Sequence, residues 1–286
     1  MKQTATFLKV LPVLAFAFGP ALAGASAQDS DTHPNELVRR VVAHELEAAK
    51  SRSGYIYRMR KESSKGTETK LMIESSNWLV GSLTRINDKP LSPQQQKKEE
   101  DRLAGLLHDA AALHKEEIQA QKNENRVKRM VRVLPNAFRY EYISSSDSGP
   151  DGDRVVRLAF APIPAFQAPT RELKVLTGMK GTIELDVTAT RLMRVEATLF
   201  RSVSFGWGIL ARLRPGGTFL LERGPIGYEQ WSTRKLDLHF RGSILLFKSL
   251  WIDSTITTDQ YQSLPGNLTL LQGLEILKKQ AEKAAE

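Results

Sequence analysis

The sequence predicts an α+β fold in which an antiparallel sheet packs on a small number of helices. Through residues 180–261, apolar and polar residues alternate in one segment after another. Successive side chains of a strand point to opposite faces, so this alternation predicts a sheet with one apolar and one polar face. Helix-forming segments lie at the start, in the middle and at the end of the chain. Because they do not alternate with the strands, a parallel sheet with crossover helices is excluded.

The first elements are expected to be a helix and a meander of three strands. The helix is predicted at residues 35–51, and Pro34 suits its start. Its apolar face carries Val38, Val41, Val42, Leu46 and Ala49. Strands joined by polar turns are predicted at residues 55–62, 68–74 and 78–87.

The middle of the chain, about residues 92–134, is predicted to be a long helical insertion. Ser92 and Pro93 form a cap and first-turn pair, and the segment is rich in charged helix formers. A bend is expected near residues 122–125, where the apolar stripe lapses, and Pro135 is expected to end the helix. Two interpretations stay open: a surface arm for a partner, or a helix packed along the sheet.

The rest of the chain is predicted to return to strands and to end in a helix. Strands are expected at residues 138–142 and 155–160, a short helix or loop at 165–175, and the main alternating sheet through residue 261. This gives ten or eleven strands in the prediction. A final helix is expected at about residues 268–286, with a charged, frayed end.

Residues 1–27 have the features of a secretory signal peptide. Lys2 and Lys9 precede a short apolar segment, and Ala25, Ser26 and Ala27 form a small-residue cleavage site. The apolar segment is shorter than the roughly 20 residues of a membrane span. We therefore expect cleavage between Ala27 and Gln28, export to the periplasm, and no integral membrane segment.

Composition narrows the function classes further. The chain has no cysteine, which excludes disulfides, thiolate metal sites, a cysteine nucleophile and the lipid-bearing cysteine of a lipoprotein. Its formal net charge is +9. A basic surplus suits anionic lipid heads or an acidic partner, and it also occurs on ordinary solvated surfaces. Export makes nucleic acid the least expected partner.

No group of residues indicates catalysis, a metal or a cofactor. The histidines are His33, His44, His108, His114 and His239, and none has a second ligand at metal spacing. The sequence contains no GxSxG motif for a serine nucleophile. Glu184 and Asp186, and likewise His239 beside Asp237, are expected on the polar face of a strand, facing solvent. We therefore expect a protein that is not an enzyme.

The candidate ligand-binding residues are the large apolar side chains expected on the inner sheet face. Few helices are available to cover a sheet of this width, so part of its apolar face could hold an acyl chain or an apolar peptide. An ordinary core would account for most of the same residues. They are Tyr55, Tyr57, Trp78, Phe138, Tyr140, Phe160, Phe219, Trp231, Phe240 and Phe247.

The order of elements resembles the LolA/LolB-like superfamily of periplasmic lipoprotein-sorting proteins. The likeness depends on the amphipathic first helix, the meander, and the segment from Met179 to Asp186 followed by the return from Leu192 to Glu196. The segments at residues 87–92 and 158–164 are similar to sequences of an uncharacterised secreted branch of that group. The resemblance implies a single domain, residues 28–286, whose curved sheet forms an incomplete (half) β-barrel closed by helices. The insertion at 92–134 departs from the carriers.

These observations favour a periplasmic binding or carrier protein for a lipid, a lipoprotein acyl group or an apolar peptide. The alternative is a protein-interaction or envelope-sensing module with a plugged half-barrel, which meets an envelope partner through its charged insertion. An outer-membrane protein would also have alternating strands, but the charged central helix and the polar helical C-terminus oppose it. A hydrolase is disfavoured because no nucleophile–base set is found.

Overall fold

The computed structural model describes residues 33–50, 54–75, 78–149, 152–206, 210–227, 230–245, 248–265 and 268–285. The predicted signal peptide and Phe247 lie outside these ranges. Within them, thirteen strands form one antiparallel sheet in the order β4-β3-β2-β1-β13-β12-β11-β8-β7-β6-β5, and β10 and β9 attach beside β12. No helix in the described part of the chain is long and apolar enough to cross a membrane.

The N-terminal elements agree closely with the prediction. Pro34 occupies the first turn of α1, where its missing N–H costs no hydrogen bond. The meander of strands follows, and each strand pairs antiparallel with the one before it. The bounds are α1 Pro34–Ala48, β1 Tyr55–Ser63, β2 Gly66–Glu74, β3 Leu79–Ile86 and β4 Lys89–Pro90.

The helical insertion is present, but it breaks at a different place from the predicted bend. It forms α2, Pro93–His108, and α3, Ala110–Ala137. The break falls at Asp109, whose carboxylate Oδ1 accepts hydrogen bonds from the amides of Ala111 and Ala112 at 2.9 and 3.1 Å. A side chain that caps new amides competes with continuation of the preceding helix. Around residues 122–125 the helix stays intact, supported by the Glu124–Lys128 ion pair at 2.7 Å.

The helix also runs past Pro135, where the sequence predicted its end. A proline in the last turn removes one intrahelical hydrogen bond. Ala137 and Phe138 are 0% and 2% exposed, so burial of the residues beyond the proline favours completion of the turn.

The later elements form the larger part of the sheet. A short 3₁₀ helix, η3, occupies part of the predicted crossover. The bounds are β5 Phe138–Ser146, β6 Val155–Pro162, η3 Glu172–Gly178, β7 Met179–Asp186, β8 Arg191–Leu199, β9 Val203–Phe205, β10 Ala211–Leu213, β11 Thr218–Gly227, β12 Gln230–Ile244, β13 Lys248–Ser263 and α4 Leu270–Ala285.

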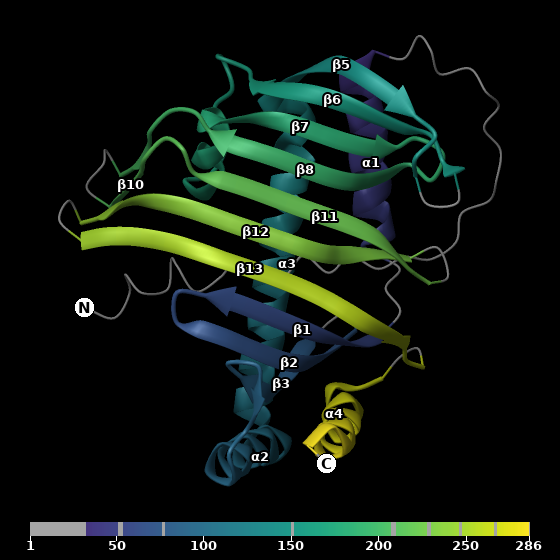
Figure 1. The fold of residues 1–286 in the computed structure, drawn as a ribbon, viewed down its shortest axis with the longest axis vertical. Coiled ribbons are helices and arrows are strands. Elements are labelled where there is room, and N and C mark those ends of the chain that lie inside the picture. Colours follow the sequence, from purple (N-terminus) through teal and green to yellow (C-terminus); the bar gives the residue numbers. More distant parts are fainter. Residues whose placement is uncertain are drawn as a thin grey trace.

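The predicted fold class is confirmed: an α+β fold whose antiparallel sheet is open, with β4 and β5 at its two ends. Figure 1 shows α1 and α3 on the same side of the sheet, with α3 running across the strand direction. We call this side the inner face and the opposite side the outer face. One large apolar cluster joins the inner face to α1 and to the C-terminal half of α3.

The outer face is not polar throughout, which corrects the expectation of a single apolar face. Ile56, Ile73 and Val80 of β1, β2 and β3 pack with Leu274 and Leu277 of α4 in a second buried cluster. Leu103 of α2 and Trp78 belong to the same cluster. The C-terminal helix therefore covers the outer face at this end of the sheet, where both faces are buried.

The edge at β3 is closed by α2. The Glu99 carboxylate accepts a hydrogen bond from the Leu83 amide at 2.8 Å, and Arg102 donates to the Gly81 carbonyl at 2.6 Å. These bonds use backbone groups that an edge strand otherwise leaves open to pairing with another chain.

The packing of Trp78 on Gly273 of α4 leads to a prediction. A Cβ at Gly273 would lie 2.2 Å from the Trp78 ring, whereas a Cβ at Gly105 of α2 would meet nothing within 4 Å. We expect Gly273→Ala to lower the free energy of unfolding by about 1–3 kcal/mol because the added methyl overpacks the contact. The control, Gly105→Ala, should raise it by about 0.5–1 kcal/mol through helix propensity. Urea unfolding measures both; a stabilised Gly273→Ala would contradict the packing described.

Candidate ligand-binding face

The inner face is built from matched rows of apolar side chains. Leu221 of β11 pairs with Val195 of β8 and with Leu236 of β12, and Leu236 pairs with Ile256 of β13. A neighbouring row joins Phe219 to Leu238. Because paired residues of adjacent strands point to the same face, each row forms a continuous apolar strip across the sheet.

Two helices cover this face, and the cover is uneven. α1 approaches β5 and β8, and α3 approaches β3 and β5 while packing along α1. Over the central strands Val195, Phe219 and Ile252 stay partly exposed, although they lie against the inner apolar cluster. These three side chains are thus partly exposed beside Leu221, Leu236 and Leu238, which are buried.

Most of the predicted ligand-binding residues are brought together on the inner face. Tyr55, Tyr57, Phe138, Tyr140, Phe160 and Phe240 all lie in its cluster, each less than one-tenth exposed. Phe219 packs partly exposed against the same cluster. They pack in one cluster with side chains of α1 and α3.

Two predicted residues lie elsewhere. Trp78 belongs to the outer-face cluster, where its indole N–H donates to the Leu268 carbonyl at 3.3 Å. Trp231 forms a small separate cluster with Ala48 at the end of α1.

Three of the inner-face aromatics pack as one group beneath the end of α3. The rings of Phe138 and Phe160 meet edge to face at 4.7 Å, and each lies 6.3 Å from the ring of Tyr140. The Tyr140 hydroxyl donates to the Leu134 carbonyl at 3.1 Å. This bond attaches the C-terminal turn of α3 to the sheet.

A buried ion pair lies at one end of the inner face. Arg223 of β11 donates to Oε1 of Glu45 at 2.7 Å, and the two side chains are 1% and 3% exposed. The same oxygen accepts the Leu192 amide of β8 at 3.0 Å. Glu45 therefore joins α1 to two strands at once, and its charge is compensated where water is excluded.

A hydroxyl network continues this polar end toward β1. The Tyr261 hydroxyl contacts Thr258 Oγ1 at 2.8 Å and the Thr233 carbonyl at 3.1 Å. Its ring stacks on Tyr57 at 4.8 Å, and the Tyr57 hydroxyl donates to Glu74 at 3.2 Å. Burial raises the pKa of Tyr261 to about 12, so the hydroxyl stays protonated.

Sequence alternation missed Tyr261 because the strand contains an irregularity. Thr258 and Tyr261 differ by an odd number of residues, yet they share a face. Gln260 between them has a φ of +56°, and the β1–β13 register shifts between Ile56 and Arg58. An irregularity of this kind reverses the alternation that follows it.

Glu45 and Arg223 were also not predicted as residues of this face, although their spacing from the neighbouring apolar residues indicates that both point inward. Glu45 follows Val38, Val41 and Val42 on the apolar side of α1. Arg223 continues the inward alternation of Phe219 and Leu221. A charge of each sign on an otherwise apolar face indicates a buried pair.

His44 lies beside this pair, at the hairpin of β7 and β8. Its Nδ1 is 3.0 Å from the Thr190 carbonyl oxygen and 3.2 Å from a guanidinium nitrogen of Arg191. Burial, followed by the charge of Arg191, lowers the pKa of His44. Among the described residues, no three His, Asp or Glu side chains gather in a group that could hold a metal.

Basic side chains on the outer face are mostly paired across strands. Arg194 contacts Glu196 and also Glu222 at 2.6 Å, while Arg157 lies 3.7 Å from both Glu184 and Glu196. His239 is on this face as predicted, but its partner is Asp253 of β13 at 2.8 Å and not Asp237. Asp237 pairs with Lys235 at 2.9 Å.

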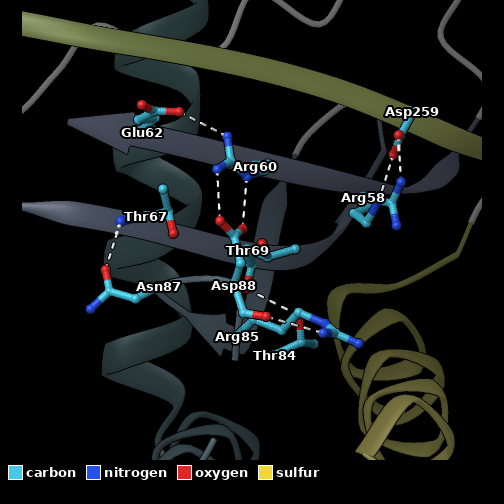
Figure 2. Close-up of polar contacts among 10 residues, drawn as sticks. All are labelled: Arg58, Arg60, Glu62, Thr67, Thr69, Thr84, Arg85, Asn87, Asp88 and Asp259. Carbon is cyan, nitrogen blue, oxygen red and sulfur yellow. Dashed lines mark hydrogen bonds and ion pairs between the residues drawn. The ribbon is translucent and has the colours of Figure 1, made fainter. Parts of the chain in front are cut away.

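Figure 2 shows the same pairing on β1. Arg60 holds both carboxylate oxygens of Asp88 at 2.8 Å and contacts Glu62 at 3.0 Å, and Arg58 pairs with Asp259 at 2.6 Å. The hydrogen bonds from Arg60 lower the pKa of Asp88. These charges are mutually satisfied, so the cluster connects the turn after β3 to β1.

Asp186 does not face solvent as predicted; it is the last residue of β7, where the chain turns back toward β8. It is 0% exposed, and its Oδ1 accepts the Ala189 amide at 2.7 Å. Burial raises its pKa to about 6, and the nearby charge of Asp153 adds to the shift.

Comparisons with known proteins give two structural neighbours. One is a domain from Vibrio parahaemolyticus that is named as an outer membrane lipoprotein-sorting protein. Its sequence is 12% identical, the alignment covers 84% of this chain and 97% of that chain, and the TM-score is 0.31. The other is a DUF1329 family protein from Desulfovibrio piger. Its sequence is 10% identical, the alignment covers 86% of this chain and 100% of that chain, and the TM-score is 0.30. No protein-family model and no curated protein matches the sequence.

The first neighbour is named for lipoprotein sorting, as is the superfamily that the order of elements resembles.

The Glu45–Arg223 pair leads to a second prediction. Glu45→Gln leaves Arg223 charged and buried beside a neutral amide, so we expect the free energy of unfolding to fall by about 3 kcal/mol. Glu45→Met combined with Arg223→Met removes both charges and should be much less destabilised than the sum of the single variants. Chemical unfolding of the wild type, Glu45→Met, Arg223→Met and the double variant gives the cycle, and additive losses would show that the two side chains are not coupled.

Asp186 leads to a third prediction. The pKa of Asp186 is higher in the folded state than in the unfolded state. Its contribution to the free energy of unfolding is therefore fully present below about pH 4 and is lost as the pH rises through about 6. In Asp186→Asn this fall should shrink by about 2 kcal/mol. The measurement is unfolding of both proteins at pH 4 and pH 7.5. An unchanged difference between the two pH values would contradict a raised pKa.

Proposed function

We propose that this chain is an exported, non-enzymatic binding or carrier protein of the periplasm. Its ligand would be a lipid, a lipoprotein acyl group or an apolar peptide, held between the inner face and the helices α1 and α3. The observation that carries the proposal is the partial exposure of Val195, Phe219 and Ile252 in the middle of an otherwise buried apolar face. Apolar surface left uncovered inside a fold costs free energy that an apolar ligand would recover.

The arrangement of the helices supports the same proposal. α1 and α3 pack against each other and approach the sheet toward β3, β5 and β8. In this proposal the pair shifts outward to admit a ligand, which breaks the Glu45–Arg223 and Tyr140–Leu134 contacts while the sheet keeps its own hydrogen bonds. The buried residues Tyr55, Tyr57, Phe138, Tyr140, Phe160 and Phe240 would then become the walls of the site.

A second function remains open because of a specific observation. The inner-face aromatics are already covered by α1 and α3, as in a half-barrel plugged by its own helices. The interaction or sensing module would use the charged, exposed side of α2 and of the first half of α3. Deletion of residues 92–134 cannot separate the two functions, since Leu103 and Val131 of this segment are buried in the two clusters.

Adjacent residues of β11 give a matched test of ligand binding. Phe219 lies on the inner face, and Leu220 lies on the outer face opposite Glu196 and Asp237. We expect the delipidated protein to take up a fluorescent fatty acid, and Phe219→Arg to weaken uptake at least about tenfold by placing a charge among apolar groups. Leu220→Arg should leave uptake unchanged.

Absence of uptake by the wild-type protein, together with absence of co-purified lipid by mass spectrometry, would reject the carrier function in favour of the second one. Equal loss in both variants would show that the inner face is not the site. Ile252→Asn, a milder change on the same face, is the second variant should Phe219→Arg fail to fold.

A further inference from the structure

Exposed apolar side chains gather at the end of the sheet where β8 finishes and β12 turns into β13. Phe200, Leu210, Leu245 and Trp251 are 40%, 41%, 45% and 63% exposed. The Leu245 amide donates to the Leu210 carbonyl at 3.3 Å, which places the two segments side by side. We call these four side chains and the basic residues around them the tip; it lies at the left of Figure 1, where β12 and β13 project furthest.

Six exposed basic side chains surround these apolar groups. They are Lys180, Arg201, Arg212, Arg214, Arg241 and Lys248. Lys180 Nζ and the Arg201 guanidinium lie 5.7 and 5.5 Å from the centre of the Phe200 ring, and the Arg241 guanidinium lies 4.6 Å from that of Trp251.

The charges of the tip differ from those on the rest of the outer face. Arg58, Arg60, Arg157 and Arg194 each have a carboxylate partner within 4 Å. In the described part of the chain, no ion pair joins any of the six basic side chains of the tip to a carboxylate. Asp253, the nearest acidic residue along β13, pairs with His239.

Exposed aromatic and aliphatic groups beside uncompensated basic groups are the composition that an anionic bilayer surface binds. The apolar groups enter the boundary of the acyl chains, aromatic rings lie at the level of the headgroups, and Lys and Arg are attracted by lipid phosphates. Trp251 pairs with Arg241, three positions in from the last β12–β13 pair at Ile244 and Lys248. At about 3.3 Å per residue it lies about 10 Å from that end, within reach of a headgroup layer.

We propose that the tip docks on the surface of a bilayer containing anionic phospholipid. Leu210 and Leu245 enter the acyl boundary, Trp251 lies at the level of the headgroups, and Arg212, Arg214, Arg241 and Lys248 contact phosphates. The docking is peripheral, and it does not depend on whether the inner face holds a ligand. A protein partner is the less favoured occupant because the basic groups of the tip are spread around its apolar side chains.

The test is sedimentation of the purified protein with vesicles, at low salt, in the absence of added ligand. One set of vesicles is pure phosphatidylcholine, and the other contains one quarter phosphatidylglycerol. We expect binding to the anionic vesicles, weak binding to the neutral ones, and release at 0.5 M salt. Arg212→Gln with Arg214→Gln should weaken partitioning by about tenfold or more, and Leu245→Ser with Trp251→Ser by at least about tenfold.

Two control variants make comparable changes away from the tip. Lys97→Gln with Lys98→Gln removes two exposed charges of α2, and Tyr142→Ser removes a 56% exposed aromatic of β5. Both should bind as the wild type does, and circular dichroism checks that every variant is folded. Failure of the wild type to bind vesicles, equal binding to neutral vesicles, or equal losses in tip and control variants would each overturn the proposal.

Discussion

The pairing of β1 with β13 holds the two parts of the sheet together. Strands β4 to β1 come from the first third of the chain, and they join the remaining strands of the sheet order only through this pair. The contact runs from Tyr55 opposite Ser263 to Ser63 opposite Ser254. Closing a loop of about two hundred residues is entropically costly, so we expect this pairing to form late, after the later strands.

The position of the C-terminal helix depends on the same pairing. β13 ends at Ser263, beside the start of β1, so the chain that follows emerges at the outer face of the meander. α4 then covers Ile56 and Ile73 from that side, while Tyr55 and Tyr57 face the inner cluster. The junction thus places an apolar layer on each side of β1, and the inner layer adjoins the candidate ligand-binding face.

Sequence alternation predicted the strands well and the coverage of the outer face poorly. The segments of β7 and β8 alternate clearly, and their placement agreed with the prediction. β1 begins Tyr55, Ile56, Tyr57, an uninterrupted apolar segment that indicates burial on both faces. Most of the aromatic residues of the inner face were predicted to lie there, whereas Glu45, Arg223 and Tyr261 were not. A buried pair depends on a partner 178 residues away, and Tyr261 depends on an irregularity that alternation cannot express.

α3 has a mechanical consequence for the whole molecule. Its 28 residues form one unbroken helix, about 42 Å long. Leu113 near its start packs with the outer-face cluster that contains α2 and α4, and Val131 near its end is buried in the inner cluster. The helix therefore connects the packing of the two apolar clusters. A movement that lifts its C-terminal half from the sheet must also disturb the packing at its other end, and a force applied at α2 or α4 is transmitted to the inner face.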